Sequence, residues 1–162
     1  MLKAFGSRKI LTQTPYFKLM EELICTKEIQ SLKEYTHHKK TTRFQHCLNV
    51  SYYNYVICRR FGLDAYAAAR AGLLHDLFFY DSTAYKKHRG HKHLRKHPLV
   101  AAENAQQFGL SPLELDIVKK HMFPITSALP KYRETVVIIF VDKYCALLEY
   151  FRPVVRKMFK CA

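Results

Sequence analysis

The chain has 162 residues, of which 49% are hydrophobic, and contains only 5 glycines and 6 prolines. This length fits one domain with a sizeable core, and the composition favours a compact helical protein over a disordered chain or a β-sandwich. The longest aliphatic or aromatic run, 136–141, is far shorter than the ~20 residues of a membrane span, and the N-terminus lacks the apolar segment of a signal peptide. We therefore expect an all-α, soluble and cytoplasmic protein with no membrane partner.

Charge and cysteine usage narrow the classes of partner. Lysine and arginine number 27 against 13 aspartates and glutamates, for a formal net charge of +14. Such a field attracts anions, phosphorylated substrates or nucleic acid, but a basic surface that is merely solvated is an equally good interpretation. The five cysteines, at positions 25, 47, 58, 145 and 161, form no CxxC pair and no even set. They argue against a thiolate zinc site and a disulfide framework, and fit a reducing cytoplasm.

Helix signals begin near the N-terminus. Thr14-Pro15 is typical of an N-cap followed by proline at the first helical position, and apolar residues follow at helical spacing. A second short helix is predicted after Thr26. We expect these N-terminal helices, at 15–36, to pack on the rest of the chain. The charged stretch that follows predicts an exposed connection, with His37 and His38 at the surface.

The next helix is predicted to begin at Arg43. Thr42 and Gln45 have the spacing of a capping box, and Phe61-Gly62 is typical of a helix end. His46 falls in the first turn of this helix, beside or on its buried face.

An apolar helix predicted after Asp64 is interrupted by the adjacent pair His75 and Asp76. Neighbours on a helix point about 100° apart, so both can approach one site only if it straddles the helix face or the helix frays there. Imidazoles and carboxylates are typical ligands of divalent transition ions, and a carboxylate can bridge two of them.

The stretch 82–96 is the most polar of the chain and has no periodicity. It predicts a loop or lid that binds anions, with a solvated loop that binds nothing as the alternative. His97-Pro98 has the pattern of an N-cap and a first helical residue, so the ring of His97 would point into a pocket at the start of a helix that ends at Gly109.

Two more helices complete the prediction. The first begins with the capping box of Ser111 and carries His121 beside its apolar stripe. The second runs from about Arg133 to Phe151. Its β-branched run could be a strand, but helical spacing continues past Asp142 and no second strand is expected to pair with it. A buried, unpaired aspartate there would be costly, and a metal ion would remove the difficulty.

Six polar residues thus lie where propensity alone would not place them: His46, His75, Asp76, His97, His121 and Asp142. A buried polar group costs about 1–3 kcal/mol unless it is partnered. The His-Asp pair alone is weak evidence, and His97 or His121, taken singly, would more often be an ordinary core or surface residue. Together, six such groups in one small domain predict a common partner, which is a metal.

In this order and spacing, the six residues resemble the HD-domain metal-dependent phosphohydrolase superfamily over about residues 43–151. The segments most similar to small bacterial HDIG-type hydrolases with a dinuclear metal site, including the diadenosine-tetraphosphate hydrolases, are Arg43-Phe44-Gln45-His46, His97-Pro98-Leu99-Val100-Ala101-Ala102 and Val141-Asp142-Lys143. The resemblance implies an all-α, PDEase-like helical bundle. It would form a single HD domain over 1–162, with the ligand-bearing core at about 43–151.

The resemblance also implies a ligand set and a reaction. His46, His75, Asp76 and Asp142 would hold one metal, and Asp76 would bridge to a second metal held by His97 and His121. By family analogy the ions would be iron or manganese, with zinc, magnesium or nickel found in preparations. A bridging hydroxide, rather than a side chain, would attack a phosphate ester of a nucleotide or related small molecule, as a phosphomonoesterase or phosphodiesterase.

Asp76, His97, Arg43 and Lys143 are the catalytic candidates. Arg43, Arg89, Lys92 and Lys143 are the candidates for binding substrate, since cations neutralise phosphate oxygens. Lys143 could equally be an exposed charge, because the neighbour of a helical ligand points elsewhere. Leu77-Phe78-Phe79 replaces the Ile-Gly-Lys of many relatives and would form an apolar wall for a base or ribose. A non-catalytic nucleotide or nucleic-acid binding module of the same fold is the alternative function, and the basic charge would serve it.

Replacement of Asp76 tests this site. We expect Asp76→Ala to abolish both metal binding and turnover, because both ions would lose a ligand, and to leave the helix content largely intact. Metal analysis, a phosphoester assay and far-UV circular dichroism measure the three properties. Hydrolysis retained in this variant would contradict the site assignment.

Overall fold

The computed structural model describes residues 2–37, 41–81 and 92–158. These residues form helices and no strand, apart from one isolated antiparallel bridge between Thr36 and Thr42. The all-α prediction is therefore confirmed. Within the same ranges, none of the helices combines the length and the hydropathy that a membrane crossing requires.

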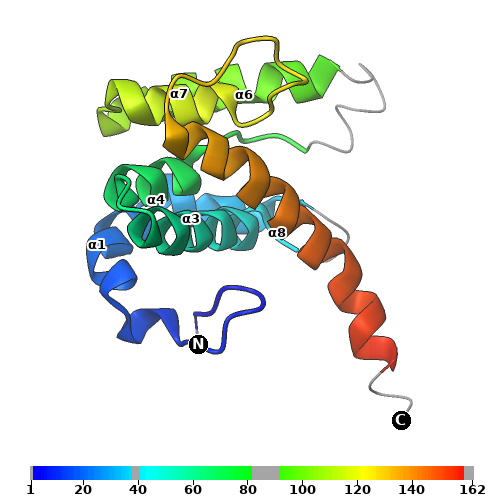
Figure 1. Cartoon of the computed structure of the whole chain (residues 1–162). Coiled ribbons are helices and arrows are strands. Elements are labelled where there is room, and N and C mark those ends of the chain that lie inside the picture. The colour runs from blue at the N-terminus through cyan, green and yellow to red at the C-terminus, as the bar shows by residue number, and fades with distance from the viewer. Residues whose placement is uncertain (1, 38–40, 82–91, 159–162) are drawn as a thin grey trace.

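The helices pack around a central pair. In chain order they are η1 (Leu11–Gln13), α1 (Pro15–Ile24), α2 (Lys27–Ser31), η2 (Leu32–Glu34), α3 (Arg43–Arg60), α4 (Ala65–Leu74), α6 (Lys92–Asn104), η3 (Ala105–Phe108), α7 (Pro112–Lys120) and α8 (Arg133–Met158). Figure 1 shows α3 and α4 side by side, with α6 and α7 together above them and α8 crossing from α7 past α3. One hydrophobic core contains buried residues from Ala4 near the N-terminus to Cys145 in α8.

Local capping chemistry sets the predicted helix starts. The side chains of four N-cap residues each accept a hydrogen bond from the backbone of the first turn: Thr14, Thr42, Asp64 and Ser111. The capping box at Ser111 is complete. Of the one predicted at Thr42, the structure shows the bond from the Gln45 backbone amide to the Thr42 hydroxyl, while the side-chain nitrogen of Gln45 donates to the Lys3 carbonyl and to Asn49.

The helix that carries His97 begins earlier than predicted. α6 starts at Lys92 and contains Pro98 in its interior, so His97 is not an N-cap and residues 92–96 are not a loop. An interior proline removes one hydrogen bond, here the bond to the carbonyl of Leu94. The helix continues past Pro98, and Ala101 and Ala102 on its inner face are buried. The rest of the predicted basic loop, 82–91, lies outside the described residues.

α4 ends just before the His-Asp pair. His75 is the C-cap, and the chain turns after it, with the Leu77 amide donating to the Leu74 carbonyl at 3.1 Å and the Phe78 amide to the Asp76 carbonyl at 2.9 Å. Asp76 therefore lies outside the helix, and its direction relative to His75 is not fixed at the ~100° of helical neighbours. Of the two arrangements that the sequence allowed, the chain uses the one in which the helix ends at the pair.

α3 and α4 approach each other very closely at Gly72. A Cβ atom built there would lie 2.8 Å from Cα and 3.0 Å from the nitrogen of Ser51. The Ser51 hydroxyl donates to the Ala69 carbonyl at 2.6 Å and accepts from the Tyr16 hydroxyl at 2.8 Å, which ties α1, α3 and α4 together. This contact holds the helix that carries His46 against the helix that ends at His75.

Gly72→Ala should therefore destabilise the protein. We expect the free energy of unfolding to fall by about 1–3 kcal/mol, because α3 must move to admit the methyl group. This loss should outweigh the ~1 kcal/mol that alanine gains in helix propensity. Urea denaturation measures the difference, with Arg60→Ala on the exposed face of α3 as a control that should change by less than about 0.5 kcal/mol. Unchanged stability of Gly72→Ala would show that the contact tolerates a side chain.

Candidate metal centre

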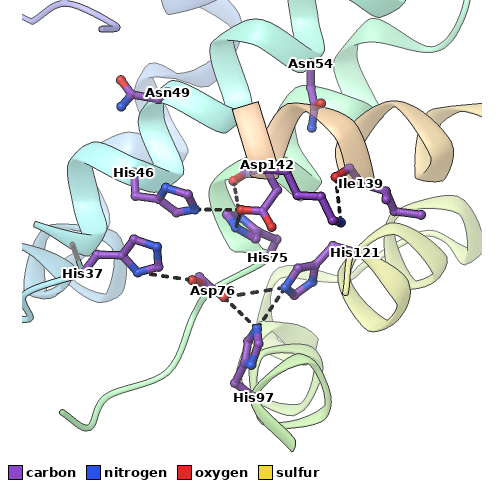
Figure 2. A network of polar contacts seen from close by, with 12 residues as sticks. His37, His46, Asn49, Asn54, His75, Asp76, His97, His121, Ile139 and Asp142 are labelled. Atoms are coloured by element: carbon purple, nitrogen blue, oxygen red, sulfur yellow. Dashed lines mark hydrogen bonds and ion pairs between the residues drawn. The ribbon is translucent and has the colours of Figure 1, made fainter. Parts of the chain in front are cut away.

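The six predicted ligands come together at one place in the fold (Figure 2). They come from α3, the end of α4 and the residue after it, α6, the end of α7, and α8: His46, His75, Asp76, His97, His121 and Asp142. Asp142 is part-buried, with 15% of its side chain exposed, and the other five are buried. Elements far apart in sequence thus bring all six candidates to one site.

One half of the site consists of His46, His75 and Asp142. Nε2 of His46 lies 3.0 Å from Oδ1 of Asp142, and Nε2 of His75 lies 3.7 Å from the same oxygen. A ligand atom from each of the three lies within 4.8 Å of the others. Two imidazoles and a carboxylate at this separation can hold one divalent ion.

The other half is built around Asp76. Its Oδ1 lies 3.3 Å from Nε2 of His97 and 3.8 Å from Nε2 of His121. His75, Asp76 and His121 form a second group whose ligand atoms lie within 4.8 Å of one another. Asp76 and His75 therefore lie where the two halves meet, and the Asp76 carboxylate can serve both.

Helix ends aim two of the rings. His75 and His121 are the C-caps of α4 and α7, and each Nδ1 donates at 2.9 Å to a carbonyl three residues earlier, of Gly72 and Val118 respectively. The last carbonyls of a helix have no partner within the helix, so these bonds satisfy both groups. Because a carbonyl can only accept, Nδ1 carries the hydrogen in both rings, and Nε2 faces the site.

Several of the atoms that face the site could bind a cation. Nε2 of His75 and Oδ1 of Asp76 are buried and have no hydrogen-bond partner among the described residues, an arrangement that costs about 1–3 kcal/mol per group. Nε2 of His97 and Nε2 of His121 lie 3.0 Å apart, so a proton or a cation must lie between them. Divalent ions bound by these nitrogens and carboxylate oxygens would satisfy all four atoms. The residues therefore fit a metal centre.

Histidines and carboxylates also control each other's ionisation. Burial alone would lower the pKa of His46, but hydrogen bonds to Asp142 and Glu149 outweigh it and raise the pKa to about 10. Burial alone would raise the pKa of Asp142, but His46 and His75 hold it well below its usual range. This half of the site is a tightly coupled group in which Asp142 is ionised.

Around Asp76, too, the histidines lower the pKa of the carboxylate, but here the pKa of a histidine is also lowered. Burial would raise the pKa of Asp76, but the surrounding histidines lower it, so this carboxylate is also ionised. Burial, followed by the neighbouring His75 and His97, lowers the pKa of His121 to about 3. A neutral His121 offers the lone pair that a metal ligand requires.

His37, which the sequence analysis assigned to the surface, contacts the site instead. Its ring stacks on His46 with the centroids 4.0 Å apart and the planes at 23°, and its Nδ1 lies 3.8 Å from Oδ2 of Asp76. The antiparallel bridge between Thr36 and Thr42 holds this segment against the start of α3, and a charged stretch gives no sign of such a bridge. The prediction for His37 was therefore wrong, while His38 lies outside the described residues.

His37 also forms a third group of close ligand atoms with His46 and Asp76. A metal ion lies near the plane of the imidazole that binds it. Two nearly parallel rings stacked 4.0 Å apart therefore do not point at one ion. In this arrangement His37 is better described as a neighbour of a metal ligand than as a ligand.

Glu149 is the second residue that the sequence analysis missed. Its carboxylate is 1% exposed, lies 3.1 and 3.2 Å from Nδ1 of His46, and accepts a hydrogen bond from the Asn49 amide at 2.9 Å. The available signal was its spacing, because Glu149 follows Asp142 by seven residues and so lies on the same face of the predicted helix.

Arg43 does not occupy the position expected of a phosphate contact. Its side chain is fully buried, and its guanidinium donates to the carbonyls of Phe78 at 2.5 Å and Tyr80 at 3.1 Å while lying 3.6 Å from the centre of the Phe78 ring. The first turn of α3 packs directly on the segment after Asp76, so both Nη groups are occupied by backbone. Arg43 positions that segment, and its assignment to substrate stays a prediction that these contacts do not support.

Of the other basic candidates for substrate binding, the structure describes the side chain of Lys143. Lys143 is exposed, and its ammonium donates to the carbonyls of Ile139 at 3.1 Å and Phe123 at 3.5 Å, close in sequence to His121 and Asp142. It remains a candidate for phosphate binding. Arg89 and the side chain of Lys92 lie outside the described residues. Of the predicted apolar wall, Leu77 and Phe78 are buried, and only Phe79, which is 39% exposed, is accessible.

Arg43→Lys tests the positioning role. Lysine keeps the positive charge but cannot bridge two carbonyls with a planar fork. We expect the free energy of unfolding to fall by about 1–3 kcal/mol, because a buried carbonyl loses its donor. Urea denaturation measures this change, and Arg59→Lys, at an exposed position of the same helix, is the matched control. Equal stability of the two variants would contradict the role.

The comparisons with known proteins agree with this geometry. The family model described as HD domain matches residues 43–147, which include all six ligand candidates. No curated protein and no solved structure matches the chain. The matched segment covers more than half of the sequence, and we conclude that the chain belongs to the HD domain family.

Proposed function

We propose that this protein is a metal-dependent phosphohydrolase that hydrolyses a phosphate ester of a nucleotide or a related small molecule. The observation that carries the proposal is the convergence of four imidazoles and two carboxylates at one place. Two of their buried atoms, Nε2 of His75 and Oδ1 of Asp76, have no hydrogen-bond partner among the described residues. Membership of the HD domain family supports it, because metal-dependent phosphohydrolases belong to this superfamily.

The ligands divide into two sets. His46, His75 and Asp142 would hold one divalent ion, His97 and His121 would hold the other, and Asp76 would bridge the two. When bound, such ions supply an activated water and stabilise the charge on a phosphoryl group. Nitrogen and oxygen ligands without a thiolate suit iron or manganese.

The remaining residues would bind substrate and fix the ligands. The carbonyls of Gly72 and Val118 orient the rings of His75 and His121, and Arg43 holds the chain that follows Asp76. Lys143 would supply a positive charge to the phosphate, and the half-exposed ring of Phe79 offers an apolar surface to a base or ribose. The net charge of +14 would draw an anionic substrate toward the protein.

Metal content is the first test. Protein purified under low oxygen, without added metal or chelator, should contain nearly two equivalents of iron or manganese per chain by elemental analysis. About one equivalent would indicate a mononuclear site and contradict the bridging role of Asp76. A protein that binds no metal, even after reconstitution, would contradict the metal centre and favour the basic binding module.

Turnover by the loaded protein then separates an enzyme from a binding module. A panel of nucleoside monophosphates, cyclic dinucleotides and dinucleoside polyphosphates should include at least one substrate whose hydrolysis stops with chelator and returns with metal. Tight binding of these compounds by the two-metal protein, without hydrolysis of any, would favour the non-catalytic alternative.

A further inference from the structure

We propose that Glu149 makes the metal position formed by His46, His75 and Asp142 the tighter of the two, so that the two positions fill in sequence. This inference rests on the proposed metal centre and adds a difference between its halves. Glu149 is not one of the six ligand candidates, and it lies beyond residues 43–147 that match the family model.

The position of Glu149 follows from helix geometry. Residues seven apart on an α-helix differ by only about 20° in direction, so Asp142 and Glu149 share the face of α8 that packs on α3. His46 lies between them, with Nε2 3.0 Å from Asp142 and Nδ1 3.1 Å from Glu149. A single helix thus supplies a carboxylate to each nitrogen of this ring.

The Glu149 carboxylate is buried and held in place. Asn49 donates to it at 2.9 Å, and the Asn49 carbonyl oxygen accepts from the Phe5 amide at 3.0 Å and from Gln45 at 2.8 Å. Within the described part of the chain, the one ion pair of Glu149 is with His46. A buried carboxylate is costly unless positive charge lies nearby, so its placement is best explained by charge at His46 or beyond it.

His75 and His121 differ from His46 in the partner of Nδ1, which for both is a neutral group. Nδ1 of His75 and of His121 donates to a backbone carbonyl, whereas Nδ1 of His46 faces a carboxylate. A hydrogen bond to a carboxylate fixes the tautomer and makes the ligating nitrogen more basic, and loss of such a partner commonly costs 10- to 100-fold in metal affinity. Glu149 therefore adds a carboxylate to the half that contains His46 and strengthens the attraction of this half for a cation.

Glu149→Gln isolates the charge, because glutamine has the same size and its amide oxygen can still accept from Nδ1 of His46. Metal-free protein is titrated with Mn²⁺ and followed by calorimetry and by electron paramagnetic resonance. The wild type should show two binding steps. In the variant the first step should weaken by about 10- to 100-fold while the second stays unchanged.

Glu114→Gln is the matched control. Glu114 is also a buried glutamate, 3% exposed, but its carboxylate pairs with Arg70 and caps α7 away from the ligands. This variant should retain both Mn²⁺ steps. If Glu149→Gln fails to fold, Glu149→Asp, which keeps the charge, provides the comparison and should bind the first ion more tightly than Glu149→Ala.

The outcomes separate this inference from the proposed function. A wild type that binds no Mn²⁺ would contradict the metal centre itself. Two steps in the wild type that are unchanged in Glu149→Gln would overturn the role of Glu149 and leave the metal centre standing. Equal weakening of both steps would also overturn it, because Glu149 would then support the whole site and not one position.

Discussion

Burial of four imidazole rings and two carboxylates inside one small helical bundle is the constraint on which this structure depends. Both aspartates are ionised, and Nε2 of His75 and Oδ1 of Asp76 have no hydrogen-bond partner in the part of the chain that the structure describes. Such an arrangement is expensive in an apolar core unless cations occupy it. The side chains at this place therefore fit divalent cations by the chemistry of their own donor atoms.

The bundle supplies this geometry with ordinary helix chemistry. α4 and α7 both end at a histidine whose Nδ1 satisfies one of the last free carbonyls of its own helix, so the helix end itself aims Nε2 at the site. The close contact at Gly72 holds α3 against α4, and Arg43 anchors the chain that leaves Asp76. Interactions that stabilise the fold thus also orient the candidate ligands.

Local sequence patterns predicted where several helices begin. Caps at Thr14, Thr42, Asp64 and Ser111 mark helix starts because a side-chain oxygen and a nearby amide are local partners. The helix containing Pro98 was misjudged, because packing on α7 outweighs one lost hydrogen bond and this packing involves residues distant in sequence. The burial of Arg43 was missed for the same reason, since the carbonyls that it binds lie 35 and 37 residues away.

By itself, the sequence determined the all-α class and the identity of the six ligand candidates, because helical periodicity, caps and unusual polar residues are all properties of short segments. Only the tertiary structure decided that these residues meet, that His37 stacks on His46, and that Glu149 lies behind the same ring. The His46 and Glu149 side chains are 103 positions apart. Their contact exists only because α8 packs on α3, and no local pattern records that packing.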